Sequence, residues 1–124
     1  FDEATAYAAG HRPCGECRNA DYRAFKRLWA VANPDVENTP KSMDRTLRAE
    51  RRAGNAPVTA TPPDGAVVTD GTDAFLLWNG AWLRWSFEGY TPAAPAGELR
   101  LLTPPAIVRM LEIGLPVTAH PSAG

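Results

Sequence analysis

The fold is decided by one stretch of the chain, AVVTDGTDAFLLWNGAWLRWSF, which runs from Ala66 to Phe87. Its concentration of β-branched and aromatic residues predicts three strands, at residues 66–69, 74–78 and 81–87. The strands are separated by Asp70-Gly71 and Asn79-Gly80, two residue pairs that are typical of tight turns. The stretch therefore predicts an antiparallel β-meander.

Both faces of this predicted sheet carry large apolar residues, because neighbours along a strand point to opposite faces. Leu77 and Trp78 point apart, and so do Trp82 and Trp85. Either the sheet is covered on both sides, or one face meets a partner. That partner would be a second copy in a homo-oligomer or a missing N-terminal segment. The chain begins at Phe1 without an initiator methionine, so we expect it to be a piece of a longer protein.

Helical periodicity dominates the segments on either side of the meander. Predicted helices cover residues 2–9, 19–33, 39–52 and 103–113. Their expected N-caps include Asp2, Thr39 and Thr103, and glycines at positions 10, 54 and 114 are natural stops.

The remaining segments join these elements into one domain. Residues 54–65 and 90–97 are rich in Pro, Ala and Gly and are predicted loops, whereas residues 99–102 and 116–119 are predicted short strands. The order is a helical part (1–53), a linker (54–65), and a meander with a helix (66–124). This order predicts a single α+β domain over residues 1–124.

Composition restricts the classes of function. The chain has 124 residues and a net charge of −1, so the molecule as a whole does not attract nucleic acid or anionic membranes. No apolar run approaches the ~20 residues of a membrane span, so no membrane partner is expected. Two cysteines only three positions apart make a poor disulfide framework, and we expect a reducing, cytoplasmic compartment.

Both cysteines and one of the two histidines lie in a single segment, HRPCGEC, from His11 to Cys17. A Cys-x-x-Cys turn places two thiolates on one side of a tight loop, which is typical of half a zinc site. Cys14 and Cys17 are the predicted zinc ligands, and His11 and His120 are the candidates for the remaining positions. Arg12, Arg18 and the start of the helix near residue 19 supply positive charge that stabilises thiolates.

Other interpretations of the two cysteines remain open. They are either a reduced pair held by packing or a thioredoxin-like redox pair. The redox interpretation requires a strand before the pair, whereas here a helix precedes it. A small metal- or thiol-dependent enzyme, with Glu16 or His11 as proton carrier, would need a pocket beside the loop. No Ser-His-Asp set, phosphate loop or His-Glu-x-x-His helix can be assembled, so no catalytic residue is assigned.

The segment AAGHRPCGECR, residues 8–18, resembles the second half of the Ada-type zinc domain of a bacterial DNA methyl-repair and regulatory protein. In that family four cysteines hold zinc, and the first accepts a methyl group from a DNA phosphotriester. Cys14 and Cys17 match the second ligand pair, nothing matches the first pair, and His11 stands where the family has an aromatic residue. The resemblance covers roughly 20 of the 124 residues and does not carry the methyl-transfer activity. The remainder, including residues 78–82 and 102–105, resembles uncharacterised conserved bacterial proteins.

Basic residues suggest a second site. The candidates for contacts with a nucleic-acid backbone are Arg12, Arg18, Arg23, Arg45, Arg48, Arg51 and Arg52. The alternative is a solvated helix face with Asp44 and Glu50 interspersed, which the net charge near zero favours. The sequence thus leads to three hypotheses: a zinc domain with a structural or nucleic-acid-binding role, a small enzyme, or a protein-interaction module that presents the aromatic sheet.

Overall fold

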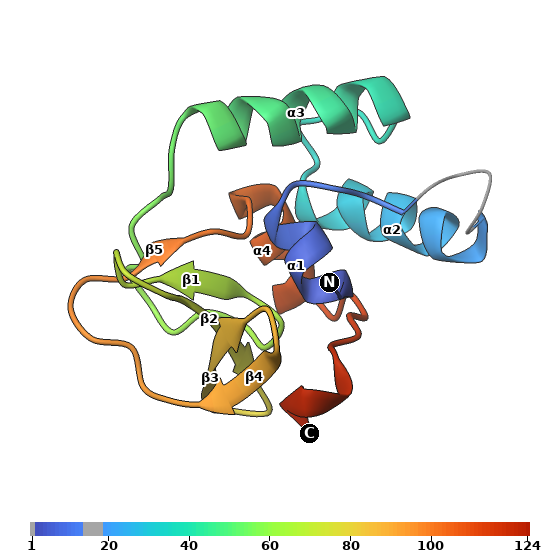
Figure 1. Ribbon diagram of the computed structural model, residues 1–124. Coiled ribbons are helices and arrows are strands. Elements are labelled where there is room, and N and C mark those ends of the chain that lie inside the picture. Colours follow the sequence, from blue (N-terminus) through green and yellow to red (C-terminus); the bar gives the residue numbers. More distant parts are fainter. Residues whose placement is uncertain (1, 14–18) are drawn as a thin grey trace.

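The computed structural model describes residues 2–13 and 19–124 of the chain (Figure 1). The helices of this part are α1 (Glu3–Ala8), α2 (Asn19–Ala32), α3 (Pro40–Arg52), α4 (Pro105–Glu112) and the short 3-10 helix η1 (Pro121–Ala123). The strands are β1 (Val67–Thr69), β2 (Ala74–Trp78), β3 (Ala81–Ser86), β4 (Gly89–Pro92) and β5 (Arg100–Leu101). The predicted α+β class, with an antiparallel sheet and a C-terminal helix, is confirmed.

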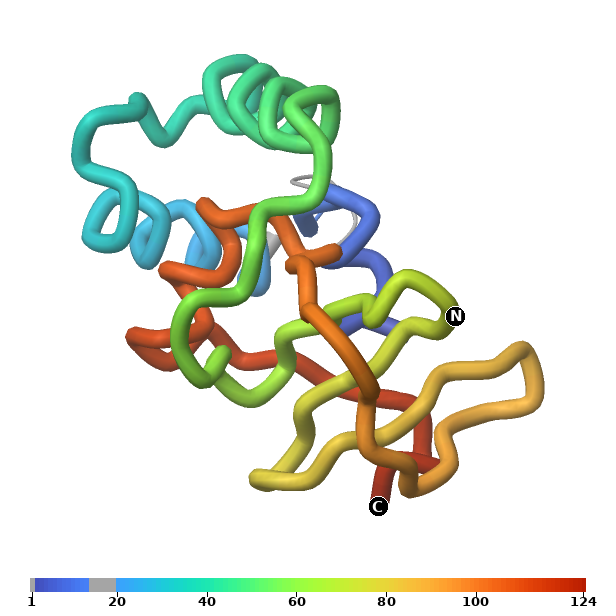
Figure 2. Tube along the Cα trace, turned by 90° about the vertical axis from the view of Figure 1, so that its left-hand side faces the viewer, coloured from blue at the N-terminus to red at the C-terminus, as the bar shows by residue number. Residues whose placement is uncertain are grey.

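The sheet has the strand order β4-β3-β2-β1-β5, and each neighbouring pair is antiparallel. The meander is therefore confirmed. The β2–β3 turn places both Asn79 (φ 50°) and Gly80 (φ 79°) in the left-handed region, as a type I′ hairpin turn requires. The helices α1 to α4 gather at one end of the sheet, whereas η1 lies beside β4, and the β3–β4 hairpin lies at the opposite end of the molecule from α3 (Figures 1 and 2).

Three predictions about local structure are wrong. The predicted loop at residues 90–97 begins with β4, which tolerates Pro92 because it is an edge strand. Residues 116–119 form no strand; there the Thr118 backbone bonds to α1, with its N–H donating to the Glu3 carboxylate and its carbonyl accepting from Ala4 N–H. Thr103 does not cap α4, because its hydroxyl accepts from Val67 N–H at 2.9 Å and so joins β1.

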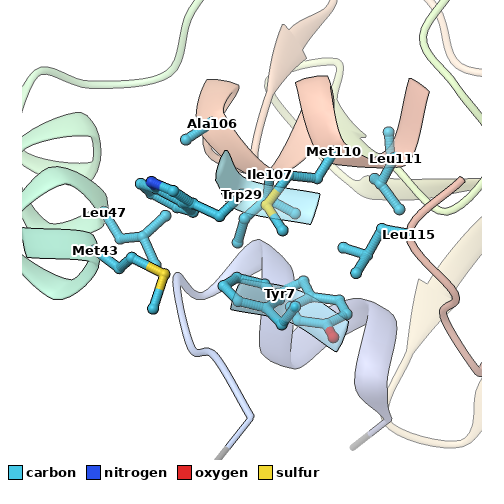
Figure 3. Close-up of a cluster of buried hydrophobic side chains, with 11 residues drawn as sticks. Tyr7, Trp29, Met43, Leu47, Ala106, Ile107, Met110, Leu111 and Leu115 are labelled. Carbon is cyan, nitrogen blue, oxygen red and sulfur yellow. The ribbon is translucent and has the colours of Figure 1, made fainter. Parts of the chain in front are cut away.

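The helical core lies between α1, α2, α3 and α4. Met43 and Leu47 point from α3 toward Trp29 of α2, and Ile107 of α4 closes the same cluster (Figure 3). Trp29, Met43 and Ile107 are fully buried. Burial of side chains of this size supplies the hydrophobic free energy that holds α3 against the rest of the domain.

The sheet is covered on both sides by the chain itself. Leu76 packs in a cluster with Val67 and Leu83, while Phe75 and Leu77 point to the other face and are also buried. The linker helps to cover the face that carries Phe75 and Leu77, because residues 58–62 line a shallow cleft together with Trp82 of β3. The sequence left open whether the sheet is covered on both sides or meets a partner on one face. At β2 the chain itself covers both sides, because Phe75, Leu76 and Leu77 are all buried. Phe87, at the β3–β4 turn, is the large aromatic residue of the described chain that stays exposed.

A polar network crosses the helical core and links three helices. The buried Asn33 side chain donates to the Ala106 carbonyl at 3.1 Å and accepts from Arg109 Nε at 2.7 Å. Glu50 accepts from Ala106 N–H at 3.0 Å and lies 3.8 Å from Arg109 Nη2. Because the N-cap of α4 is a proline without a side-chain acceptor, Glu50 of α3 provides a carboxylate for the first turn of α4.

The two ends of the described chain meet at β4. The Asp2 carboxylate accepts from the Tyr90 hydroxyl at 2.8 Å and from His120 N–H at 2.9 Å, and it also caps α1. Partial burial raises the pKa of Asp2, but these hydrogen bonds outweigh it and leave the pKa below its ordinary value. Burial and the Asp2 carboxylate raise the pKa of Tyr90 well above its ordinary value.

Candidate functional site

The described segment that leads to the two cysteines begins where α1 ends. Gly10 has a φ of 84°, a left-handed conformation that favours glycine, and a Cβ there would lie 2.6 Å from Cδ of the exposed Arg51 side chain. His11 follows and is exposed, with its N–H donating to the Ala6 carbonyl. Cys14, Glu16, Cys17 and Arg18 lie outside the described residues.

Arg12 ties the entrance of this loop to α2 and α3. Its Nε and Nη2 bind the two carboxylate oxygens of Asp44 at 2.7 and 3.0 Å, a bidentate pair. Its guanidinium also lies 5.6 Å from the centre of the Tyr22 ring. Arg12 was a candidate for nucleic-acid contacts, and the structure places its charge against another part of the same chain.

His120, the other proposed ligand, takes part in a turn at the far end of the chain. Its Nδ1 accepts from Ser122 N–H at 3.2 Å and lies 2.9 Å from Ser122 Oγ, so it caps η1. Within residues 2–13 and 19–124, no three His, Cys, Asp or Glu side chains come together as a metal-ligand group. His11 and His120 therefore do not complete a site with the described carboxylates.

A pocket of about 360 Å³ lies beside the entrance of the loop, as an enzyme at this loop would need. Its lining includes Asp2, Glu3, Tyr7, His11 and Thr118. Both carboxylates are already committed, since Asp2 caps α1 and Glu3 accepts from Thr118 N–H at 2.8 Å. His11 makes no side-chain hydrogen bond with another described residue, and an imidazole by itself does not form an acid–base pair.

The outer side of α3 carries a continuous row of cations. Lys41, Arg45, Arg48 and Arg52 follow one another at spacings of four, three and four residues, which places them on one helix face. All four are exposed, and they lie opposite the buried Met43 and Leu47. None of the four makes an ion pair with a residue in the described part of the chain. We call these four residues the basic face.

The two acidic residues of α3, which the alternative of a solvated mixed face invokes, are both engaged by partners. Glu50 points inward, where it serves α4 and Arg109. Asp44 lies at the flank of α3 and is held by Arg12. Arg12 offsets the charge of Asp44, and Arg109 lies 3.8 Å from Glu50, so neither carboxylate is ion-paired with the basic face.

The other basic candidates lie elsewhere. Arg23 is exposed on α2, on the side away from Phe25 and Trp29. Arg51 leaves the basic face because its stem packs against Gly10. Sequence reasoning missed Lys41, although the spacing from 41 to 52 contained the signal needed to find it.

The part of the chain that the structure describes contains no helix with both the length and the apolar composition needed to span a membrane. Comparison with protein-family models, curated proteins and solved structures finds no match for this chain.

Proposed function

We propose that this domain binds nucleic acid through the basic face of α3 and that Cys14 and Cys17 bind zinc in the loop before α2. One observation carries the first part: four exposed cations share a helix face, while both carboxylates of that helix are bound by partners inside the molecule. Neutralisation of phosphates by Lys and Arg, with release of counterions, is the main source of such affinity. The net charge of −1 does not oppose it, because the charge that matters is local.

The uneven charge along the chain supports the same proposal. Up to Pro57 the chain has ten Lys and Arg against eight Asp and Glu, and beyond it three against six. The excess of acidic residues thus lies in the part of the sequence that forms the sheet and α4, whereas the part that contains α3 has an excess of cations. This asymmetry orients the domain with α3 toward a polyanion.

Two matched charge reversals test the basic face. Arg48→Glu on α3 and Arg84→Glu on β3 change the net charge equally, and both residues are exposed. Binding to a fluorescein-labelled DNA of mixed sequence is followed by fluorescence anisotropy at low salt. Arg48→Glu is expected to weaken binding about tenfold, and Arg84→Glu less than about twofold. Equal losses, or no binding by the unaltered protein, contradict the proposal.

The zinc part rests on the sequence pattern. Thiolate and imidazole are the donors that zinc prefers, and His11 is three positions before Cys14. Because His120 caps η1, His11 is the histidine that we propose as a third ligand.

Metal analysis of protein purified without added metal tests this part. About one zinc per chain is expected, and Cys14→Ser/Cys17→Ser should remove it. His11→Ala should weaken retention against a chelator, while His120→Ala serves as the matched control. A content below about 0.2 zinc per chain in the unaltered protein ends the zinc proposal.

A further inference from the structure

We infer that the nucleic acid bound by the basic face is duplex DNA rather than a single strand or an RNA duplex. This inference rests on the proposed function and concerns only the form of the polyanion. It draws on what the basic face contains, on what it lacks, and on the shape of the helix that presents it.

The basic face lacks the groups that hold single strands. Proteins that bind single-stranded nucleic acid combine cations with aromatic side chains on which successive bases stack. The large aromatic residue exposed in the described chain is Phe87, which lies edge-on to Trp85 at 4.7 Å. It belongs to the β3–β4 turn, at the opposite end of the molecule from α3 in both views (Figures 1 and 2). No base held at the basic face would reach it.

The solvent-exposed positions between the cations carry no aromatic side chain. The exposed residues there are Ala49, whose methyl group neither stacks nor accepts a hydrogen bond, and Arg51, whose stem packs against Gly10. The basic face therefore offers charge without an aromatic ring for stacking, which suits a ligand whose bases are already stacked on one another.

The basic face also has the length and stiffness to match a rigid ligand. From Lys41 to Arg52 the helix rises about 16 Å, at 1.5 Å per residue. A duplex carries one phosphate charge per ~1.7 Å of its axis, so this length faces more phosphates than the four cations need. A flexible single strand would have to be ordered along the helix, at a cost in conformational entropy that a duplex does not incur.

The shape of the groove separates DNA from RNA. A helix is about 10–12 Å across, which fits the major groove of B-form DNA at about 12 Å. The major groove of A-form RNA is too narrow for side chains to enter. The α3 helix lies at the edge of the molecule, with its outer side clear of the other helices and the sheet (Figure 1), and it can approach a groove without rearrangement of the fold.

Anisotropy titrations with three probes of one sequence test the inference: a DNA duplex, its single strand, and the corresponding RNA duplex. We expect the DNA duplex to bind about fivefold or more tightly than either of the others. Equal or tighter binding of the single strand or of the RNA duplex overturns this inference but leaves the proposed function standing. Failure of all three probes to bind overturns the proposed function itself.

The variant Arg45→Ala/Arg48→Ala distinguishes the basic face from other surfaces in the same experiment. It should remove the preference for the DNA duplex as well as most of the affinity, whereas Arg84→Ala should leave both unchanged. A preference for the duplex that survives in Arg45→Ala/Arg48→Ala places the binding surface elsewhere and contradicts the inference.

Discussion

The two sides of α3 differ in whether their charged side chains have partners within the described chain. On the inner side, Glu50 is held by Ala106 N–H and Arg109, and at the flank Asp44 is held by Arg12. On the outer side, the four cations of the basic face make no ion pair with a described residue. Paired charges on the inner side position the helix, so their loss should cost stability. Unpaired charges on the outer side do not hold the fold together, so their loss should cost binding only.

The largest expected effect is a loss of stability when the hydrogen bonds on the inner side of α3 are disrupted. Asn33→Ala removes the buried side chain that joins the Ala106 carbonyl to Arg109, so two hydrogen bonds are lost and a cavity is left between α2 and α4. We expect the free energy of unfolding to fall by about 2–3 kcal/mol. Urea denaturation measures it, with the exposed Asn55→Ala as a control that should change little. A loss for Asn33→Ala as small as that of the control contradicts the role assigned to the network.

The carboxylate of Asp2, which lies outside α3, tests whether the loss of a paired charge costs stability elsewhere in the molecule. Tyr90→Phe deletes the hydroxyl that donates to Asp2 at 2.8 Å. Because Asp2 is only partly buried and keeps its other donors, we expect a smaller loss of stability, about 1–2 kcal/mol. Thermal unfolding at neutral pH provides the measurement, and an unchanged Tm shows that the bond contributes nothing.

The same pair predicts how stability depends on pH. The pKa of Tyr90 is raised by folding, so its contribution is complete below the unfolded tyrosine pKa of about 10 and is lost as the pH rises above that value. The pKa of Asp2 is lowered, so its contribution is present above the unfolded pKa of about 3.9 and is lost as the pH falls through the folded pKa. In Tyr90→Phe the alkaline part of this loss should shrink.

The smallest expected effect lies at the boundary between the two sides. In Arg12→Met the carboxylate of Asp44 is released beside Lys41 and Arg48, its neighbours at three and four residues along α3. We expect DNA binding to weaken about threefold to tenfold, because the freed charge pairs with the basic face. Adding Asp44→Asn should restore the affinity.

The control for that cycle is Asp35→Asn in the Arg12→Met background, which removes an exposed carboxylate outside α3. Restoration by Asp44→Asn alone supports the arrangement of the charges. If neither substitution restores the affinity, Arg12 contacts DNA directly and its pairing with Asp44 is incidental.

Most of the fold was predictable because local signals agree with the tertiary structure. Asp2 and Thr39 cap their helices as predicted, and the Asn79-Gly80 turn adopts the positive φ values that this pair favours. The errors lie where a distant contact decides. Thr103 was predicted to be a helix cap, but its hydroxyl accepts a hydrogen bond from Val67 N–H of β1. No local sequence pattern indicates that bond.

The candidate site was less predictable for the same reason. A helical period places Lys41, Arg45, Arg48 and Arg52 on one face. It does not show which distant residues bind the neighbouring carboxylates. The pairing of Asp44 with Arg12 spans 32 residues of sequence, and that of Glu50 with Ala106 spans 56. Composition near neutrality therefore suggested a mixed surface, although the folded chain separates the charges.

The salt dependence of DNA binding tests the central claim most directly, because the slope of log Kobs against log[salt] counts the phosphates that the protein neutralises. For duplex DNA and the four cations of the basic face we expect a slope of about −3.6, and removal of two in Arg45→Ala/Arg48→Ala should reduce its magnitude by about 1.8. Both proteins should unfold at the same urea concentration. A slope that these two substitutions leave unchanged would show that the basic face does not contact phosphates.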